Sequence, residues 1–122
     1  MIKNDSLTEK IIGCCYKVHN ELGPGFNEKI YHNALESELE KTGLFFESEK
    51  EFKVNYGGKY VGKFRVDLVV ENKVIVEIKA INAGFMKVFE SQLVSYLKSS
   101  GLHTGLLVNF GNDSCKIKRM VF

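Results

Sequence analysis

The chain has 122 residues, of which 44% are hydrophobic and 26% are charged, and its formal net charge is +2. These values are typical of a single globular domain over residues 1–122, and they exclude a disordered chain, a coiled coil and a collagen-like repeat. Every apolar stretch is far shorter than the roughly 20 residues that a membrane-spanning helix needs, so we expect no contact with a membrane.

The three cysteines and the first residues indicate a compartment. Cys14 and Cys15 are adjacent and Cys115 is distant, so neither a disulfide framework nor a zinc-binding Cys-x-x-Cys spacing is present. The N-terminal sequence MIKNDSLTEK contains no apolar region of a secretory signal peptide. We therefore expect a protein of the reducing cytoplasm.

The charge is unevenly distributed along the chain. Residues 1–51 carry ten acids and six bases, a net charge of −4, whereas residues 52–122 carry five acids and eleven bases, a net charge of +6. A basic second half is compatible with a polyanionic partner, although lysines scattered over a solvated surface would give the same count.

The first third of the chain predicts two helices. Ser6 and Glu9 have the spacing of a capping box, which predicts a helix from Ser6 that ends before Gly23. Asn27 is a good N-cap for a second helix, which we expect to end at Gly43.

The remaining sequence changes to an extended pattern with one further helix. Aromatic-rich runs on both sides of Gly57-Gly58 predict a hairpin, and β-branched runs predict strands up to residue 70 and over 74–79. An apolar stripe predicts a helix over 85–100, and strands follow over 103–110 and 115–121. The predicted order is α-α-β-β-β-α-β-β, an α+β or mixed α/β domain with one central sheet.

Three charged residues interrupt the apolar strands in the middle of the sequence. Glu77 and Lys79 alternate on one face of their strand. If residues 71–73 form a three-residue turn, Asp67 lies opposite Glu77. Two carboxylates at such a short distance repel each other, and a divalent cation such as Mg²⁺ would relieve that repulsion. An ion-pair network of Asp67, Glu77 and Lys79 is the structural alternative.

The same residues match a known signature. Asp67 followed by Glu77-Ile78-Lys79 resembles the Asp…(Asp/Glu)-x-Lys motif of the PD-(D/E)XK nuclease superfamily, and the predicted order of elements resembles its restriction-endonuclease-like core. The string Gly25-Phe26-Asn27-Glu28-Lys29-Ile30-Tyr31 reads as Gly-x-x-Glu-x-x-Tyr and resembles the GxxExxY family of that superfamily. Val66 stands where the superfamily motif has proline.

The resemblance implies a metal-dependent nuclease and assigns roles to residues. Asp67, Glu77 and the backbone carbonyl of Ile78 would hold Mg²⁺ or Mn²⁺, while Lys79 would orient the attacking water and stabilise the transition state. Glu28 would project toward the metal, although an acid in the first turn of a helix also complements the helix dipole.

Three further residues are candidates for supporting roles. Gln92 and Tyr96 resemble the Gln-x-x-x-Tyr motif of RecB-type nucleases, which lies beside the active site; Gln92 at a helix edge bonded to backbone is the alternative. Tyr31 either supports Glu28 or packs in the core, and packing is the favoured interpretation.

These residues support a nuclease acting on nucleic acid, with DNA favoured and RNA open. The alternative from another class is a module on a nuclease-like scaffold that binds nucleic acid or a protein partner without turnover. The sequence contains no appended element for choosing a target, so specificity would come from a homodimer or a partner protein.

Overall fold

The computed structural model describes residues 3–84 and 87–122. Two helices come first, α1 (Lys3–Leu22) and α2 (Glu28–Thr42), followed by the strands β1 (Phe46–Tyr56), β2 (Lys59–Val70) and β3 (Val74–Lys79). The chain continues through α3 (Lys87–Ser100), β4 (Thr104–Asn109) and β5 (Lys116–Val121). This order confirms the predicted α-α-β-β-β-α-β-β arrangement and the mixed α/β class.

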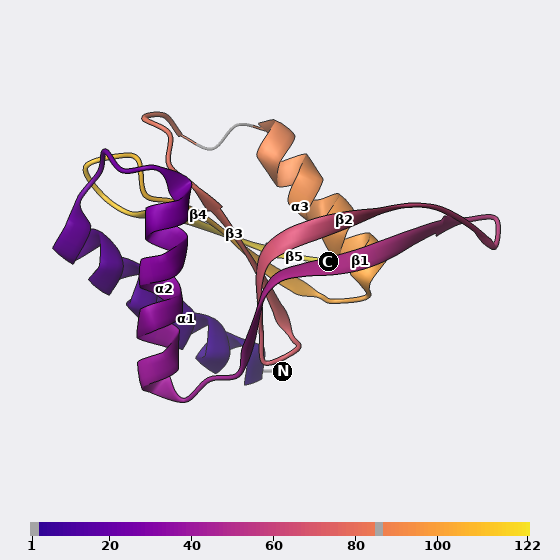
Figure 1. Ribbon diagram of the computed structural model, residues 1–122, viewed down its shortest axis with the longest axis horizontal. Coiled ribbons are helices and arrows are strands. Elements are labelled where there is room, and N and C mark those ends of the chain that lie inside the picture. Colours follow the sequence, from indigo (N-terminus) through magenta and orange to yellow (C-terminus); the bar gives the residue numbers. More distant parts are fainter. Residues whose placement is uncertain (1–2, 85–86) are drawn as a thin grey trace.

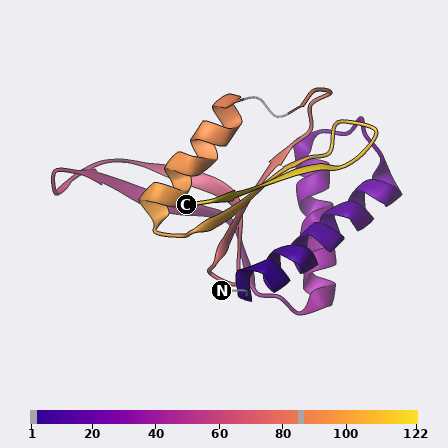
Figure 2. The ribbon, with the colours of Figure 1, turned by 180° about the vertical axis from the view of Figure 1, so that it is seen from behind.

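The five strands form one mixed sheet in the order β1-β2-β3-β4-β5. Only β3 and β4 run parallel, because α3 connects them, and the other neighbours are antiparallel. The helices α1 and α2 cover one face of the sheet and α3 covers the other (Figures 1 and 2). No helix within the described residues is long and apolar enough to span a membrane.

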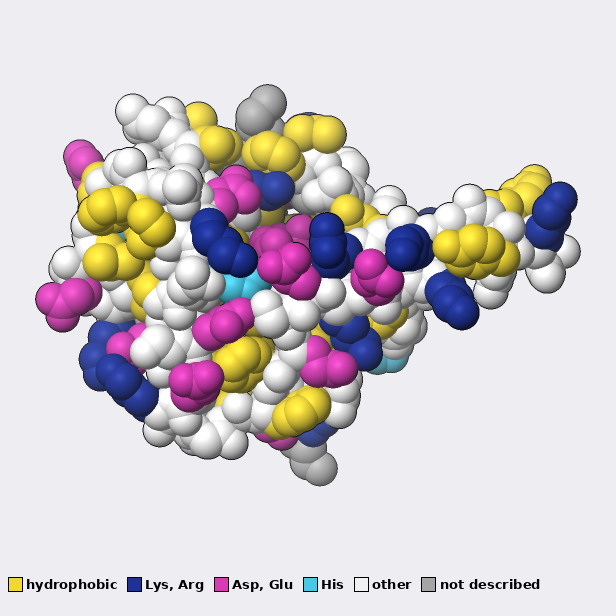
Figure 3. Space-filling view, in the orientation of Figure 1, with side chains coloured by type: hydrophobic (Ala, Val, Ile, Leu, Met, Phe, Trp, Pro, Cys, Tyr) yellow, Lys and Arg dark blue, Asp and Glu magenta, His cyan; other side chains and the backbone are white. Residues whose placement is uncertain are grey.

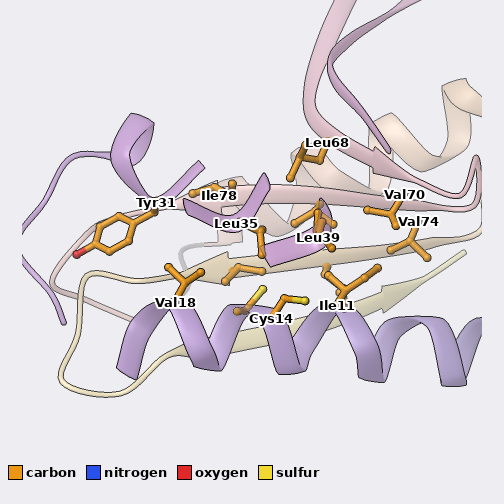
Figure 4. Packing of buried hydrophobic residues seen from close by; sticks show 14 of the residues in the cluster. Ile11, Cys14, Val18, Tyr31, Leu35, Leu39, Leu68, Val70, Val74 and Ile78 are labelled. Atoms are coloured by element: carbon orange, nitrogen blue, oxygen red, sulfur yellow. The ribbon is translucent and has the colours of Figure 1, made fainter. Parts of the chain in front are cut away.

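The larger core lies between the sheet and the first two helices. Ile11, Cys14 and Val18 on α1 and Leu35 and Leu39 on α2 point toward the strands (Figure 4). A smaller core, centred on Leu93 and Leu97 of α3, packs on the opposite face. Residues of β3 alternate between the two cores, so this strand is buried on both faces and its position is fixed.

The structure confirms most of the predicted turns. The side chain of Asn27 accepts a hydrogen bond from the Ile30 N–H at the start of α2, and Gly43 ends the helix with φ of 77°. The hairpin turn at Gly57-Gly58 has positive φ at both residues, as a two-residue hairpin with this twist requires.

The predicted start of the first helix is wrong, because α1 begins at Lys3 and not at Ser6. Residues 3–5 include neither proline nor glycine, so each can extend the helix, and elongation gains a backbone hydrogen bond that capping at Ser6 would forgo. The predicted start of the third helix, at Phe85, lies outside the described residues.

Candidate active site

The strands β2 and β3 separate at Asp67 and Glu77. Their ladder pairs Val70 with Val74 and ends where Leu68 faces Val76. At the next position each acid reaches the backbone of the opposite strand. The Asp67 N–H donates to Glu77 Oε2 at 2.7 Å, and the Ile78 N–H donates to Asp67 Oδ2 at 2.7 Å. The predicted register is therefore confirmed, and side chains replace the missing backbone bonds.

A local twist of the β1–β2 ribbon accompanies this separation. Phe46 on β1 and Leu68 on β2 pack against the α1–α2 core, whereas Phe52 on β1 and Phe64 on β2 pack against the α3 core. Residues an even number of positions apart on a regular strand would point to the same face. The ribbon therefore turns over between these pairs. Glu49 lies at the turnover point with φ of 52°, a left-handed conformation that costs energy in a residue other than glycine.

Glu77 is a buried acid with an altered pKa. Its residue is only 6% exposed. The pKa of Glu77 is raised to about 8. Burial is the largest cause, the charges of Asp67 and Glu28 also raise the pKa, and the Asp67 N–H and Lys79 lower it. The two neighbouring acids lack sufficient positive charge nearby to balance them, so a bound cation would stabilise their charged forms.

Lys79 projects from the end of β3 on the same side as Glu77. Its Nζ lies 4.3 Å from the ring centroid of Phe89 on α3, a cation–π contact that restrains the ammonium group. Its charge lowers the pKa of Glu77, so the two side chains interact electrostatically.

A pocket of about 360 Å³ opens beside the two acids. It lies between the start of α2 and the twisted part of the β1–β2 ribbon, and Ile78 contributes to its wall although the residue is only 1% exposed. Figure 3 shows acidic side chains near the middle of this face with basic side chains beside them. The lining residues are Glu28, Lys29, His32, Glu49, Arg65, Asp67 and Ile78.

The backbone of Ile78 presents an acceptor to this pocket. In a β-strand the N–H and C=O of one residue point to the same neighbouring strand. Because the Ile78 N–H points toward Asp67 on β2, the Ile78 carbonyl points the same way, beyond the last pair of the ladder. Two carboxylates and one carbonyl are thus available as oxygen ligands.

These oxygen donors do not form a complete metal cage. Over residues 3–84 and 87–122, no group of three His, Cys, Asp or Glu side chains is arranged to hold a metal ion. Glu28 is exposed in the first turn of α2, where it lines the pocket and acts on Glu77 through its charge. A cation held by two carboxylates, a carbonyl and otherwise water or phosphate is the usual environment of Mg²⁺.

The structure places Tyr31 in the core. The Tyr31 hydroxyl donates to the Gly23 carbonyl at 2.5 Å and accepts from the Phe26 N–H at 3.2 Å, and its ring stacks on Phe110 at 4.7 Å. Tyr31 therefore fixes the α1–α2 turn that precedes Glu28, which agrees with the packing interpretation.

The two predicted residues of α3 lie on the side of the helix that faces the strands. Tyr96 stacks on Phe64 at 4.3 Å, and its pKa is raised by burial and by the charges of Glu77 and Asp67. Gln92 is exposed and lies between Tyr96 and Phe89, the residue that contacts Lys79. The side chain of Gln92 forms no hydrogen bond with any residue that the structure describes.

The sequence analysis missed four polar residues of the pocket, which are Lys29, His32, Glu49 and Arg65. His32 is buried, and its Nε2 lies 2.7 Å from Glu36 Oε2 and 2.9 Å from Ser48 Oγ. The spacing of Glu28 and His32, four residues apart on one helix, could have revealed it. Arg65 was missed because its ion pair with Glu49, at 3.5 Å, depends on the pairing of two strands.

Comparison with known families agrees with this geometry. A family model described as the PD-(D/E)XK nuclease superfamily matches residues 5–120. The chain belongs to the PD-(D/E)XK nuclease superfamily. In this superfamily member, Asp67 and the Glu77-Ile78-Lys79 segment occupy adjacent strands, as the superfamily signature requires.

One solved structure shares the architecture of this PD-(D/E)XK protein. The crystal structure of SSO0001 is similar to it, with a TM-score of 0.63 and 27% sequence identity, over 76% of this chain and 48% of that chain. The chain therefore spans about half the length of that protein. No curated protein matches the sequence.

Proposed function

We propose that this protein is a metal-dependent nuclease that hydrolyses phosphodiester bonds, with DNA as the preferred substrate and RNA as the other candidate. The observation that carries the proposal is the pair of crossed carboxylates, Asp67 and Glu77, beside Lys79 in a chain of the PD-(D/E)XK superfamily.

The acids of this site are suited to a divalent cation. Asp67 Oδ1 and Glu77 Oε1 are not the atoms that accept the cross-strand N–H bonds, and the Ile78 carbonyl points toward the same gap. These three groups would hold Mg²⁺ or Mn²⁺, and Glu28, which lines the same pocket, would bind a coordinated water. A bound cation would neutralise the two acids and polarise the scissile phosphate.

Lys79 supplies a positive charge beside this position. Its contact with Phe89 restrains the side chain, so the ammonium group is pre-organised to orient a water and to stabilise charge that develops on the phosphate. Gln92, one turn before Tyr96 on the same helix, is positioned to contact the nucleic-acid backbone.

We further propose that the chain is a member of the GxxExxY family within this superfamily. This proposal rests on Gly25, Glu28 and Tyr31, and two of these residues have separate roles. Glu28 lines the pocket, while Tyr31 fixes the turn through its bond to the Gly23 carbonyl. The motif would therefore combine one functional residue with one structural residue.

Cleavage assays test the proposal directly. The purified protein is incubated with Mg²⁺ or Mn²⁺ and with labelled single-stranded DNA, duplex DNA, branched DNA and RNA. We expect metal-dependent cleavage that falls at least 100-fold in Lys79→Ala and in Asp67→Asn. Lys73→Ala is the matched control, because Lys73 lies in the turn at the opposite end of β3.

Metal binding separates the remaining explanations. We expect Mn²⁺ to raise the melting temperature of the wild type and of Lys79→Ala but not of Asp67→Asn. Metal binding without cleavage of any substrate would support the non-catalytic binding module. No metal binding, together with unchanged stability on neutralising all three charged residues, would indicate a structural ion-pair network and contradict the proposal.

A further inference from the structure

The β1–β2 hairpin extends beyond the rest of the sheet as an arm, defined here as residues 53–65. Beyond the twist, β1 and β2 are hydrogen-bonded only to each other, because the β2–β3 ladder ends at Leu68. Both ribbon views show the arm projecting from the body of the molecule (Figures 1 and 2). An exposed ribbon of this length has no part in the core apart from its base.

One face of the arm collects its positive charge. Side chains alternate along a strand, so Lys63 and Arg65 of β2 point to the same face. Directly opposed residues of neighbouring strands share a face, so Lys53, which opposes Lys63, lies on it, and so does Tyr60, which opposes Asn55. The register shift between Val54 and Asn55 places one extra residue in β2, so Lys59 and its partner Tyr56 lie on the other face. We call Lys53, Tyr60, Lys63 and Arg65 the basic face.

The charge of the basic face is incompletely neutralised. The arm contains no Asp or Glu. Lys63 pairs with Glu51 at 3.3 Å and Arg65 with Glu49 at 3.5 Å, both acids lying nearer the body. Lys53 forms no ion pair with any described residue. Opposed like charges, such as Lys53 and Lys63, destabilise a sheet, so the arrangement favours an anionic partner.

Exposed aromatic side chains accompany these lysines. Tyr60 on the basic face is 54% exposed, and Tyr56 is 79% exposed on the other face at the same end of the hairpin. Hydrophobic and basic side chains alternate along the arm in Figure 3. Aromatic rings next to lysines suit a partner that offers both stacking surfaces and phosphates, which is the chemistry of a nucleic acid.

The basic face leads to the candidate active site. Arg65 lines the pocket and lies two residues from Asp67. Alternate residues of a strand are about 6.6 Å apart, so the face extends roughly 15 Å from Arg65 to Tyr60. That length matches about four base pairs at 3.4 Å each. A substrate lying along the arm would therefore enter the pocket.

The base of the arm is fixed in this orientation. Phe52 stacks on Phe64 at 5.4 Å, and Phe64 stacks on Tyr96 of α3 at 4.3 Å. The stack holds the other face of the arm against α3, so the basic face stays open. A pre-organised surface loses little conformational entropy on binding.

We propose that the basic face of the arm binds the nucleic-acid strand on one side of the scissile bond and guides it into the pocket. The identity of the partner rests on the proposed nuclease function, whereas the role of the arm in binding can be measured without cleavage.

Binding is measured by fluorescence anisotropy with a labelled 20-nucleotide single strand and the corresponding duplex, without divalent metal and at several salt concentrations. The test variants are Lys53→Ala/Lys63→Ala and Tyr60→Ala. The control is Lys10→Ala/Lys73→Ala, which removes the same charge from a shallow pocket between α1 and the β2–β3 turn.

We expect the double arm variant to weaken duplex binding at least tenfold and to reduce the slope of log K against log salt by about 2, since each phosphate contact contributes about 0.9. The control should retain the slope of the wild type. Tyr60→Ala should weaken single-strand binding about tenfold with an unchanged slope, because a ring stacks without releasing counterions.

Three results would overturn the inference. In the first, the wild type does not bind either nucleic acid. In the second, the arm variants bind like the control. In the third, Tyr60→Ala dissociates a dimer in light scattering while both lysine variants bind normally. The last result would identify a second copy of the chain as the partner. Binding that depends on the arm without any cleavage would contradict the nuclease proposal and leave the arm inference intact.

Discussion

At the scale of single residues, Glu77 shows how the site combines structural and chemical demands. One carboxylate oxygen replaces a missing ladder partner by accepting the Asp67 N–H at 2.7 Å. The same side chain is buried next to a second acid, which raises its pKa to about 8. The fold therefore stabilises the position of Glu77 while destabilising its charge, and a bound cation would remove that conflict.

The raised pKa predicts how stability depends on pH in metal-free protein. Between the ordinary pKa of 4.5 and about 8, the folded state binds a proton at Glu77 that the unfolded state has released. The free energy of unfolding should therefore fall as the pH rises through this window. Urea unfolding in EDTA, measured from pH 5 to pH 8, tests the slope.

Glu77→Gln should remove most of this fall, because glutamine does not titrate and can still accept the Asp67 N–H. Glu51→Gln is the control, since Glu51 is half exposed next to the base of the arm and should leave the slope unchanged. Equal slopes in the wild type and in Glu77→Gln would contradict the assignment of the raised pKa to this residue.

At the scale of elements, hydrogen bonds from the helices and β4 fix the loops around the site. Tyr31 of α2 bonds to the Gly23 carbonyl of the α1–α2 turn. His19 of α1 contacts the Asn112 carbonyl, 2.8 Å from its Nε2, in the loop after β4. The ring of Phe110 lies between them and stacks on Tyr31. The turn before Glu28 is thus bound to the end of the sheet.

Tyr31→Phe should lower the free energy of unfolding by about 1 kcal/mol, the usual net contribution of one hydrogen bond, since the ring stack is retained. Tyr31→Ala should cost about 3 kcal/mol or more, because it also leaves a cavity against Phe110. Denaturant unfolding of both variants measures the difference, and an unchanged free energy of unfolding in Tyr31→Phe would show that the hydroxyl contributes nothing.

Asn109 organises the loop that leaves the site after Lys79. Its side chain is fully buried, accepts hydrogen bonds from the Ile81 and Gly111 N–H groups, and donates to the Ile81 and Ala83 carbonyls. Gly111 lies against this loop so closely that a Cβ would approach the Ile81 backbone to 2.4 Å. One amide group and one glycine thus shape the segment between β3 and α3.

Asn109→Ala should destabilise the protein by about 2–4 kcal/mol, because several backbone groups lose their partners in a partly buried loop. Gly111→Ala should be destabilising as well, since the added methyl meets backbone rather than a movable side chain. Thermal unfolding of each variant tests this. Asn112→Ala is a milder comparison, as it removes a single bond to the Ala83 carbonyl.

The features that depend on local sequence, which are helix ends, turns and the order of elements, could be predicted. Asn27, Gly43 and the Gly57-Gly58 pair specify ends and turns within a few residues, so the order of elements followed from them. The three-residue turn at 71–73 set the register that brings Asp67 opposite Glu77. The left-handed Glu49 and the ion pair of Arg65 could not be predicted, because they depend on how the β1–β2 ribbon twists against α2 and α3.

At the scale of the whole molecule, the β1–β2 ribbon packs against the helices on both faces of the sheet. Its inner half contacts the core under α1 and α2, and its outer half contacts the core under α3. The turnover between these halves coincides with Asp67 and Glu49. The direction of the arm and the geometry of the site are therefore set by the same twist, and the stack of Phe52, Phe64 and Tyr96 holds it.

This coupling predicts a difference between two substitutions of Tyr96. Tyr96→Phe keeps the stack, so the arm should remain fixed. Tyr96→Ala removes the ring on which Phe64 lies, so amide hydrogen exchange in the arm should accelerate by tenfold or more while exchange in β3 and β4 changes little. If the arm carries substrate to the pocket, Tyr96→Ala should also raise KM more than it lowers kcat. Unchanged exchange in the arm would mean that the β1–β2 pairing alone keeps its direction, and the stack would then have no role in presenting the basic face.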